Sequence, residues 1–329
     1  MTKASPIKQR RKKVFWLVAV LIAAPLIWIL IYFASSDPPI AHGHIEYNVP
    51  YKEGLLLDVY QPTQQVYEKS PVVLYVHGGA WIAGRKEAVN INRFHGAINA
   101  LREAGYTIVS PEYTLAGGGR GPFPYCIEDV YDVVTWIRTN AVKYSFDLKN
   151  VGIFGESAGA HISMLVAYAE PEVFVTDFRP IPFNYVIDIY GPNQLEGIYH
   201  SKTIDTLNSL IEDLPENIRS RVDIVQQIFG FDPAKDVERA QGIIDVYSPY
   251  NYVHAQIAPS LLIQGDEDRL VPVEQTISLK AKMDSLGVES KMHILQGVDH
   301  AFAGATKAQK DSIQQWVFEF ISERYDSNK

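Results

Sequence analysis

The sequence predicts an α/β protein in which helices cover both faces of a mostly parallel, eight-stranded sheet. From residue 44 onward, short apolar runs alternate with longer helical patterns. Several middle runs, such as VVLYV at 72–76 and LLIQ at 261–264, are almost continuously apolar, which is typical of strands buried on both faces. Alternation of this kind favours parallel strands joined by crossover helices.

Eight strands and five long helices are expected in the body of the chain. The strands span His44–Val49, Leu55–Tyr60, Val72–His77, Thr107–Glu112, Val151–Phe154, Tyr185–Tyr190, Ser260–Gln264 and Lys291–Leu295, and the first two are close enough to form an antiparallel pair. The helices span Lys86–Glu103, Cys126–Tyr144, Ala158–Ala169, Val273–Leu286 and Ala308–Tyr325. A polar helical stretch at about 193–244 separates the sixth strand from the seventh, so we expect a cap insertion there within a domain spanning 44–329.

The composition is that of a packed globular chain and excludes several classes of partner. The 329 residues are 47% hydrophobic and 21% charged. The net charge of −8 includes +6 from basic side chains within residues 1–13, which leaves −14 for the rest. A body this acidic repels phosphate backbones, so no nucleic acid is expected. The single cysteine, Cys126, excludes an internal disulfide, and the absence of a His/Cys/carboxylate cluster at metal-ligand spacing implies no metal or other cofactor.

The N-terminal segment predicts a membrane anchor. Residues 14–33 form an uncharged run of twenty residues, which as a helix would span roughly 30 Å, the thickness of a bilayer core. Basic residues at 1–13 precede the run, which predicts a cytoplasmic N-terminus and a body outside the cytoplasm. Residues 34–43 then form a linker. A cleaved signal peptide is the alternative, since Ala34-Ser35-Ser36 offers small residues, but its apolar region is usually only 7–15 residues long.

A strand-to-helix junction carries the first candidate for chemistry. GESAG at 155–159 matches G-x-S-x-G and lies between an apolar strand and a helical pattern. In that context a sharp turn lifts the Ser157 hydroxyl clear of the sheet, as a nucleophile requires. The following helix points N–H groups at developing negative charge. HGGAW at 77–81 follows another apolar strand, and we expect the N–H groups of Gly79, Ala80 and Ala158 to bind an oxyanion.

A serine nucleophile needs a base, and the base needs a carboxylate that orients it. The chain order Ser…Asp/Glu…His places both after Ser157. His300 follows the last expected strand and is the candidate base. The loop after the seventh strand holds Asp266, Glu267 and Asp268, and spacing alone does not choose among them.

The motifs together resemble those of the α/β-hydrolases. HGGAW at 77–81, GESAGAHI at 155–162, GDEDRLVP at 265–272 and DHAF at 299–302 occur in the order typical of the esterase branch related to hormone-sensitive lipase and to small bacterial acetyl and feruloyl esterase-like enzymes. In that family the acid lies three positions after the loop glycine, here Gly265. The resemblance therefore implies Asp268.

These observations predict a membrane-anchored serine hydrolase that cleaves a small-molecule carboxylic ester through Ser157, His300 and Asp268. HGG-x-W is also similar to the pattern of kynurenine formamidases, so an amidase or formamidase of the same fold is the alternative. A non-catalytic binding ectodomain is the third hypothesis, because hydrolase folds also serve as scaffolds. The presence of nucleophile, base and acid argues against it.

Overall fold

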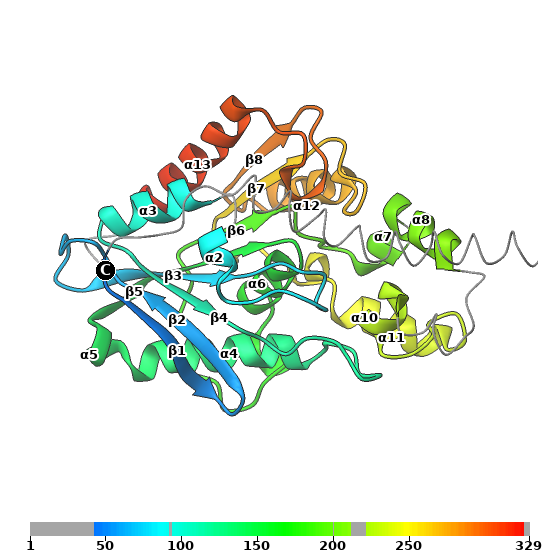
Figure 1. Ribbon diagram of the computed structural model, residues 1–329, viewed down its shortest axis with the longest axis horizontal. Coiled ribbons are helices and arrows are strands. Elements are labelled where there is room, and N and C mark those ends of the chain that lie inside the picture. Colours follow the sequence, from blue (N-terminus) through cyan, green and yellow to red (C-terminus); the bar gives the residue numbers. More distant parts are fainter. Residues whose placement is uncertain (1–42, 92–93, 200, 212–221, 326–329) are drawn as a thin grey trace, which may run out of the picture.

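The structure, a computed structural model, describes residues 43–91, 94–199, 201–211 and 222–325. Within these residues, eight strands form one sheet in the order β1-β2-β4-β3-β5-β6-β7-β8 (Figure 1). The strands are β1 (Ile45–Lys52), β2 (Leu55–Tyr60), β3 (Ser70–Val76), β4 (Thr107–Pro111), β5 (Phe146–Glu156), β6 (Val186–Ile189), β7 (Ser260–Gly265) and β8 (Ser290–Leu295). This is the α/β-hydrolase fold with the eight strands that the sequence predicts.

The strand directions also follow the sequence prediction. β2 pairs antiparallel with both β1 and β4, and every pair from β4 through β3 to β8 is parallel. The carboxyl ends of β3, β5, β7 and β8 therefore lie at one edge of the sheet. This is the edge where ligands bind in open α/β sheets.

Helices flank the sheet and extend beyond that edge. They are α2 (Ala88–Ile91), α3 (His95–Glu103), α4 (Tyr125–Thr139), α5 (Ala141–Tyr144), α6 (Ala158–Tyr168), α7 (Leu195–Tyr199), α8 (Lys202–Ile211), α10 (Ile224–Phe229), α11 (Val237–Val246), α12 (Val273–Ser285) and α13 (Lys307–Ser322). Among the described residues, helices α7, α8, α10 and α11 lie between β6 and β7 in the chain and form the cap at the right of Figure 1.

Two expected helices are each divided in two. The helix expected over Lys86–Glu103 is α2 followed by α3, and Phe94, which precedes α3, has the non-helical angles φ −104° and ψ 9°. The Phe94 ring packs on Phe154, with centroids 5.1 Å apart, so tertiary packing sets the chain direction there. The helix expected over Cys126–Tyr144 breaks at Asn140, whose Nδ2 donates to the Trp136 carbonyl at 2.9 Å. Such a side-chain bond competes with the helical backbone pattern.

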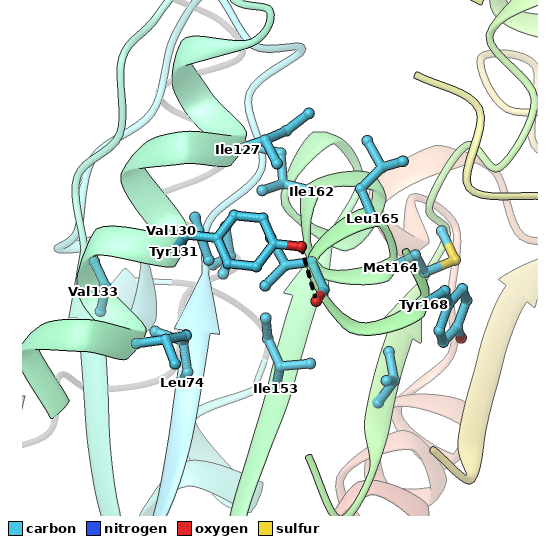
Figure 2. Packing of buried hydrophobic residues seen from close by; sticks show 14 of the residues in the cluster. Leu74, Ile127, Val130, Tyr131, Val133, Ile153, Ile162, Met164, Leu165 and Tyr168 are labelled. Carbon is cyan, nitrogen blue, oxygen red and sulfur yellow. Dashed lines mark hydrogen bonds between the residues drawn. The ribbon is translucent and has the colours of Figure 1, made fainter. Parts of the chain in front are cut away.

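The core lies on both faces of the sheet. Buried residues of α4, α6 and α12 cover one face, and those of α3 and α13 cover the other. Figure 2 shows the first of these layers, where Tyr131 and Val130 of α4 meet Ile162 and Leu165 of α6. Burying each such side chain contributes about 1.5–3 kcal/mol. This packing fixes α6, and with it the turn that carries Ser157.

The predicted membrane anchor, residues 14–33, lies outside the described residues, as do the basic segment 1–13 and the linker 34–43 apart from Gly43. In the ranges that the structure does describe, no helix combines the length and the apolar character that a membrane span requires.

Candidate active site

Ser157 occupies a strained turn between β5 and α6. Its φ of 51° and ψ of −121° are unusual for a residue with a side chain, and such a conformation costs about 1–3 kcal/mol, which the surroundings must offset. The Ser157 N–H donates to the Ile189 carbonyl of β6 at 2.9 Å. A Cβ atom at Gly159 would lie 2.1 Å from the Val76 carbonyl oxygen. Only glycine allows α6 to pack this closely on the end of β3, which explains the last glycine of the GESAG motif.

The Ser157 hydroxyl lies within hydrogen-bond distance of His300. Ser157 Oγ is 3.0 Å from His300 Nε2, and His300 Nδ1 is 2.8 Å from Asp268 Oδ2. Because a carboxylate only accepts, the Nδ1–H group must donate to Asp268, which leaves Nε2 of the neutral ring free to accept the serine proton. The side chains of Ser157, His300 and Asp268, which the sequence singles out, thus lie in one chain of hydrogen bonds.

The geometry distinguishes Asp268 from the other acids of its loop. Asp268 is 7% exposed, and its Oδ1 accepts the N–H groups of Leu270 at 3.0 Å and Val271 at 2.8 Å. Its Oδ2 also accepts from Gln264 Nε2 at 3.2 Å. Asp266 and Glu267 are exposed. Three donors therefore hold the Asp268 carboxylate in one orientation toward the imidazole.

Three residues that the sequence analysis did not single out support the imidazole. The Tyr190 ring lies edge-on to the His300 ring, with centroids 4.9 Å apart. The Tyr190 hydroxyl donates to Glu156 Oε2 at 2.7 Å, and the Tyr75 hydroxyl donates to Oε1 of the same carboxylate at 2.6 Å. Glu156 is the variable residue before the serine in G-x-S-x-G, a position to which the motif assigns no role.

The HGGAW segment after β3 forms a compact loop beside Ser157. The His77 ring stacks on Tyr113, with centroids 4.2 Å apart, and the Tyr113 hydroxyl donates to the His77 carbonyl at 2.9 Å. Burial lowers the pKa of His77 to about 4, so this ring is neutral. Gly79 and Ala80 have φ values of 128° and 52°. The loop contains the first two predicted oxyanion donors, and the third, Ala158, is the first residue of α6.

His161 joins the cap to the helix behind the serine. It is fully buried, and its Nε2 lies 2.6 Å from the carbonyl oxygen of Tyr247, the residue that ends α11. Burial lowers the pKa of His161 to about 3. Its ring packs against Trp81 and Phe123, with centroids 5.0 and 5.5 Å apart. His161 is therefore a packing residue.

Two of the hollows lined by described residues of the cap lie away from the serine. One has a volume of about 480 Å³ and is lined by Tyr199, Asp223 and Pro233, among others. The second, of about 240 Å³, lies beside it. Neither is lined by Ser157, Asp268 or His300, so the geometry of those side chains, and not the depth of a cavity, marks the candidate site. No group of three or more His, Cys, Asp or Glu residues in the described part of the chain is arranged to hold a metal ion.

Comparison with known proteins shows what this chain is similar to. Esterase LipQ of Mycobacterium tuberculosis is 24% identical over 283 residues, which cover 84% of this chain and 62% of the relative. The probable carboxylic ester hydrolase LipM of the same organism is 26% identical over 301 residues, covering 86% and 61%. The chain thus spans about three-fifths of the length of these curated relatives.

Solved structures share the fold. A truncated form of a carbohydrate esterase from gut microbiota superposes with a TM-score of 0.66 at 21% identity, covering 87% of this chain and all of that one. Esterase B from Lactobacillus rhamnosis has the same TM-score at 17% identity, covering 95% and 97%.

A family model describes most of the body. The model named BD-FAE matches residues 57–283, a span that includes the HGGAW loop, Ser157 and Asp268 and ends before His300. Because the match covers more than half of the chain and the fold is that of the α/β-hydrolase esterases, this chain belongs to the BD-FAE family within the esterase branch of the α/β-hydrolases.

Proposed function

We propose that the protein is a serine hydrolase that cleaves carboxylic esters of small molecules. The observation that carries the proposal is the pair of distances that join Ser157 Oγ to His300 Nε2 at 3.0 Å and His300 Nδ1 to Asp268 Oδ2 at 2.8 Å. A serine hydroxyl is activated when a base lies within hydrogen-bond distance of it and a carboxylate orients that base. The esterase names of the relatives LipQ and LipM support an ester as the substrate.

In the proposed reaction, His300 takes the Ser157 proton while Oγ attacks the ester carbonyl. The carbonyl oxygen becomes an oxyanion, which the N–H groups of Gly79, Ala80 and Ala158 stabilise. Losing one such donor typically costs about 2.7–4 kcal/mol of transition-state stabilisation. The protonated His300 then gives its proton to the leaving alcohol as the C–O bond breaks, and Asp268 stabilises the charged ring in between. His300 then deprotonates a water molecule that attacks the acyl-enzyme. As the acyl–Oγ bond breaks, His300 returns the proton to Ser157 Oγ and the acid leaves.

We also propose that residues 14–33 anchor the protein in a bilayer, with the N-terminus in the cytoplasm and the catalytic domain outside. Twenty uncharged residues preceded by a basic segment support this arrangement. After an alkaline carbonate wash the full chain should stay with the membrane pellet, and protease added from outside should digest the body. Recovery of the intact chain in the supernatant would contradict the anchor.

The enzymatic proposal is tested by hydrolysis of p-nitrophenyl acetate, butyrate and octanoate. The wild type should turn over at least one ester, and Ser157→Ala should abolish turnover. Ser163→Ala is a matched control, because Ser163 lies on the same helix, is fully buried and has an Oγ without a hydrogen-bond partner among the described atoms. A folded wild type that leaves all three esters intact would refute esterase activity on such substrates, and formyl amides would then be the next substrates to assay.

A further inference from the structure

Hydrogen bonds join the start of the loop that carries Asp268 to the end of β8 and to the loop that carries His300. The Asp266 N–H donates to the Leu295 carbonyl at 3.0 Å, and the Glu267 N–H donates to the Val298 carbonyl at 3.1 Å. The Gly297 N–H donates back to Asp266 Oδ1 at 2.7 Å. These bonds lie between the ends of β7 and β8 and lead directly to the residues that contact each other in the candidate site.

Asp299, the residue before His300, adds further contacts between the two loops. Its Oδ1 accepts the N–H groups of Arg269 at 3.0 Å and of His300 at 2.7 Å. Its Oδ2 accepts from Arg269 Nε at 2.7 Å and forms an ion pair with the same guanidinium. One carboxylate thus contacts the residue after Asp268 and the backbone of His300 itself.

The environment keeps this carboxylate charged. Burial opposes ionisation, but hydrogen bonds from the Arg269 side chain and backbone and from the His300 N–H lower the pKa of Asp299 below its ordinary value of 3.8. Asp299 therefore remains an acceptor for all of these donors at neutral pH.

The turn that presents His300 needs such restraint. Ala301 and Phe302, which follow it, have φ values of 57° and 55°, and left-handed residues other than glycine persist only where the surroundings over-determine them. The Asp299 N–H donates to the Ala303 carbonyl at 2.9 Å, and the Ala303 N–H donates to the His300 carbonyl at 3.2 Å. The Asp299 side chain adds a hydrogen bond that joins this turn to the backbone of Arg269.

Arg269 is held from the cap as well. Its carbonyl accepts both the N–H of Thr203 at 3.2 Å and the Oγ1–H of Thr203 at 3.0 Å. The Arg269 side chain is nevertheless 70% exposed, and an ion pair at the surface adds little to stability. This ion pair therefore matters for the position of the two loops that it joins, and not for the stability of the fold.

We propose that Asp299 and Arg269 are positioning residues that hold the Asp268 and His300 loops at a fixed separation, so that the imidazole stays within reach of both Ser157 and Asp268. The inference rests on the proposed serine-hydrolase function. The two residues do not touch the reacting atoms. Their substitution should slow the chemical step and leave substrate binding unchanged.

The experiment compares Asp299→Ala, Asp299→Asn and Arg269→Gln with the wild-type full chain. Two assays are run on each variant. Hydrolysis of p-nitrophenyl acetate gives kcat and KM, and labelling of Ser157 by an alkyl fluorophosphonate gives a second-order rate constant. Lys280→Gln is the matched control, because Lys280 is half-buried on α12 and forms an ion pair with the exposed Asp284, away from the site. Melting temperatures are recorded for all variants.

Asp299→Ala should lower kcat and the labelling rate about 10- to 100-fold, since misplacement of a catalytic group by about 1 Å costs up to 100-fold. Arg269→Gln should lower both about 3- to 10-fold. Asp299→Asn retains an oxygen for the two backbone N–H groups and should restore part of the loss seen in Asp299→Ala. KM should stay within about twofold of the wild type throughout, and Lys280→Gln should match the wild type.

Wild-type rates in both Asp299→Ala and Arg269→Gln would overturn the inference. A lowered melting temperature with unchanged rates would overturn it too, because the pair would then only support the fold. If Asp299→Ala does not fold, Asp299→Asn and Arg269→Gln decide the question by the same criteria. If the wild type leaves the ester intact but is labelled at Ser157, the ester proposal fails and the labelling rates alone judge the inference. A wild type that is neither active nor labelled refutes both.

Discussion

Asp188 of β6 is a buried acid that the proposed reaction does not use, and it makes a sharp prediction about stability. It is 1% exposed. Its Oδ1 accepts the Gly191 N–H at 2.8 Å, and its Oδ2 has no hydrogen-bond partner among the described atoms. Burial, opposed by the bond from Gly191, raises the pKa of this carboxyl from 3.8 to about 7. Asp188→Asn places an uncharged group of the same shape at this position and keeps an oxygen for Gly191.

The direction in which Asp188 changes the unfolding free energy with pH follows from the protons bound by the folded and unfolded states. Between about pH 4 and about pH 7 the folded protein holds a proton on Asp188 that the unfolded chain has released, so stability falls as the pH rises. One pKa unit corresponds to about 1.4 kcal/mol, so this group should remove about 2.5 kcal/mol of unfolding free energy from the wild type between about pH 5 and about pH 8. The Asp188→Asn variant has no such group. The remaining titrating groups are common to both proteins.

Urea denaturation followed by tryptophan fluorescence measures the prediction. The unfolding free energy of Asp188→Asn minus that of the wild type should rise by about 2.5 kcal/mol from about pH 5 to about pH 8. A difference that stays constant within about 0.5 kcal/mol would mean that Asp188 is already ionised in the folded protein at the lower pH. The reasoning from burial would then be wrong.

Three further substitutions test the candidate site. Asp268→Asn should lower kcat for p-nitrophenyl acetate by about 10³- to 10⁴-fold, because an amide no longer selects the required imidazole tautomer, and a loss below about tenfold would contradict the assigned role. Tyr113→Phe leaves the His77 carbonyl without its donor and should cost about 1–3 kcal/mol in urea denaturation, with a lower kcat; unchanged values would show that the loop does not depend on this bond. Gly159→Ala places a methyl group against the Val76 carbonyl and should destabilise the fold by about 1–3 kcal/mol, whereas wild-type stability would contradict the close approach.

Strands whose every side chain is buried are among those that the sequence predicts well. In β3 and β7, all residues are buried, and continuous apolar runs reveal them. β5 is longer than predicted: it begins at Phe146, whereas the apolar run begins at Val151. Its first half holds half-exposed polar residues such as Asp147, so hydropathy does not reveal it. Phe146 nevertheless pairs with Ser70 of β3, which tertiary structure alone determines.

The choice among the acids after β7 illustrates a different limit. Asp266, Glu267 and Asp268 lie in the loop after β7, and Asp299 lies next to His300 in the loop after β8. The structure distinguishes the three aspartates by the hydrogen-bond donors that each carboxylate contacts. Asp266 accepts a backbone N–H of the neighbouring loop, Asp299 accepts those of two loops, and Asp268 is the one that faces the His300 ring. Sequence spacing carries no information about which loop lies opposite, so only the resemblance favoured Asp268.

The supports of the imidazole depend on sheet register, which is why no local pattern reveals them. Tyr75 of β3 lies opposite Phe154 of β5, and Glu156 of β5 lies opposite Ile189 of β6. This register brings Tyr75 and Tyr190 to the same carboxylate from two neighbouring strands. A slip of one residue in either pairing would turn the side chains to the opposite face of the sheet. The motif therefore predicts the nucleophile Ser157, whereas the register of the sheet determines which side chains support the His300 ring.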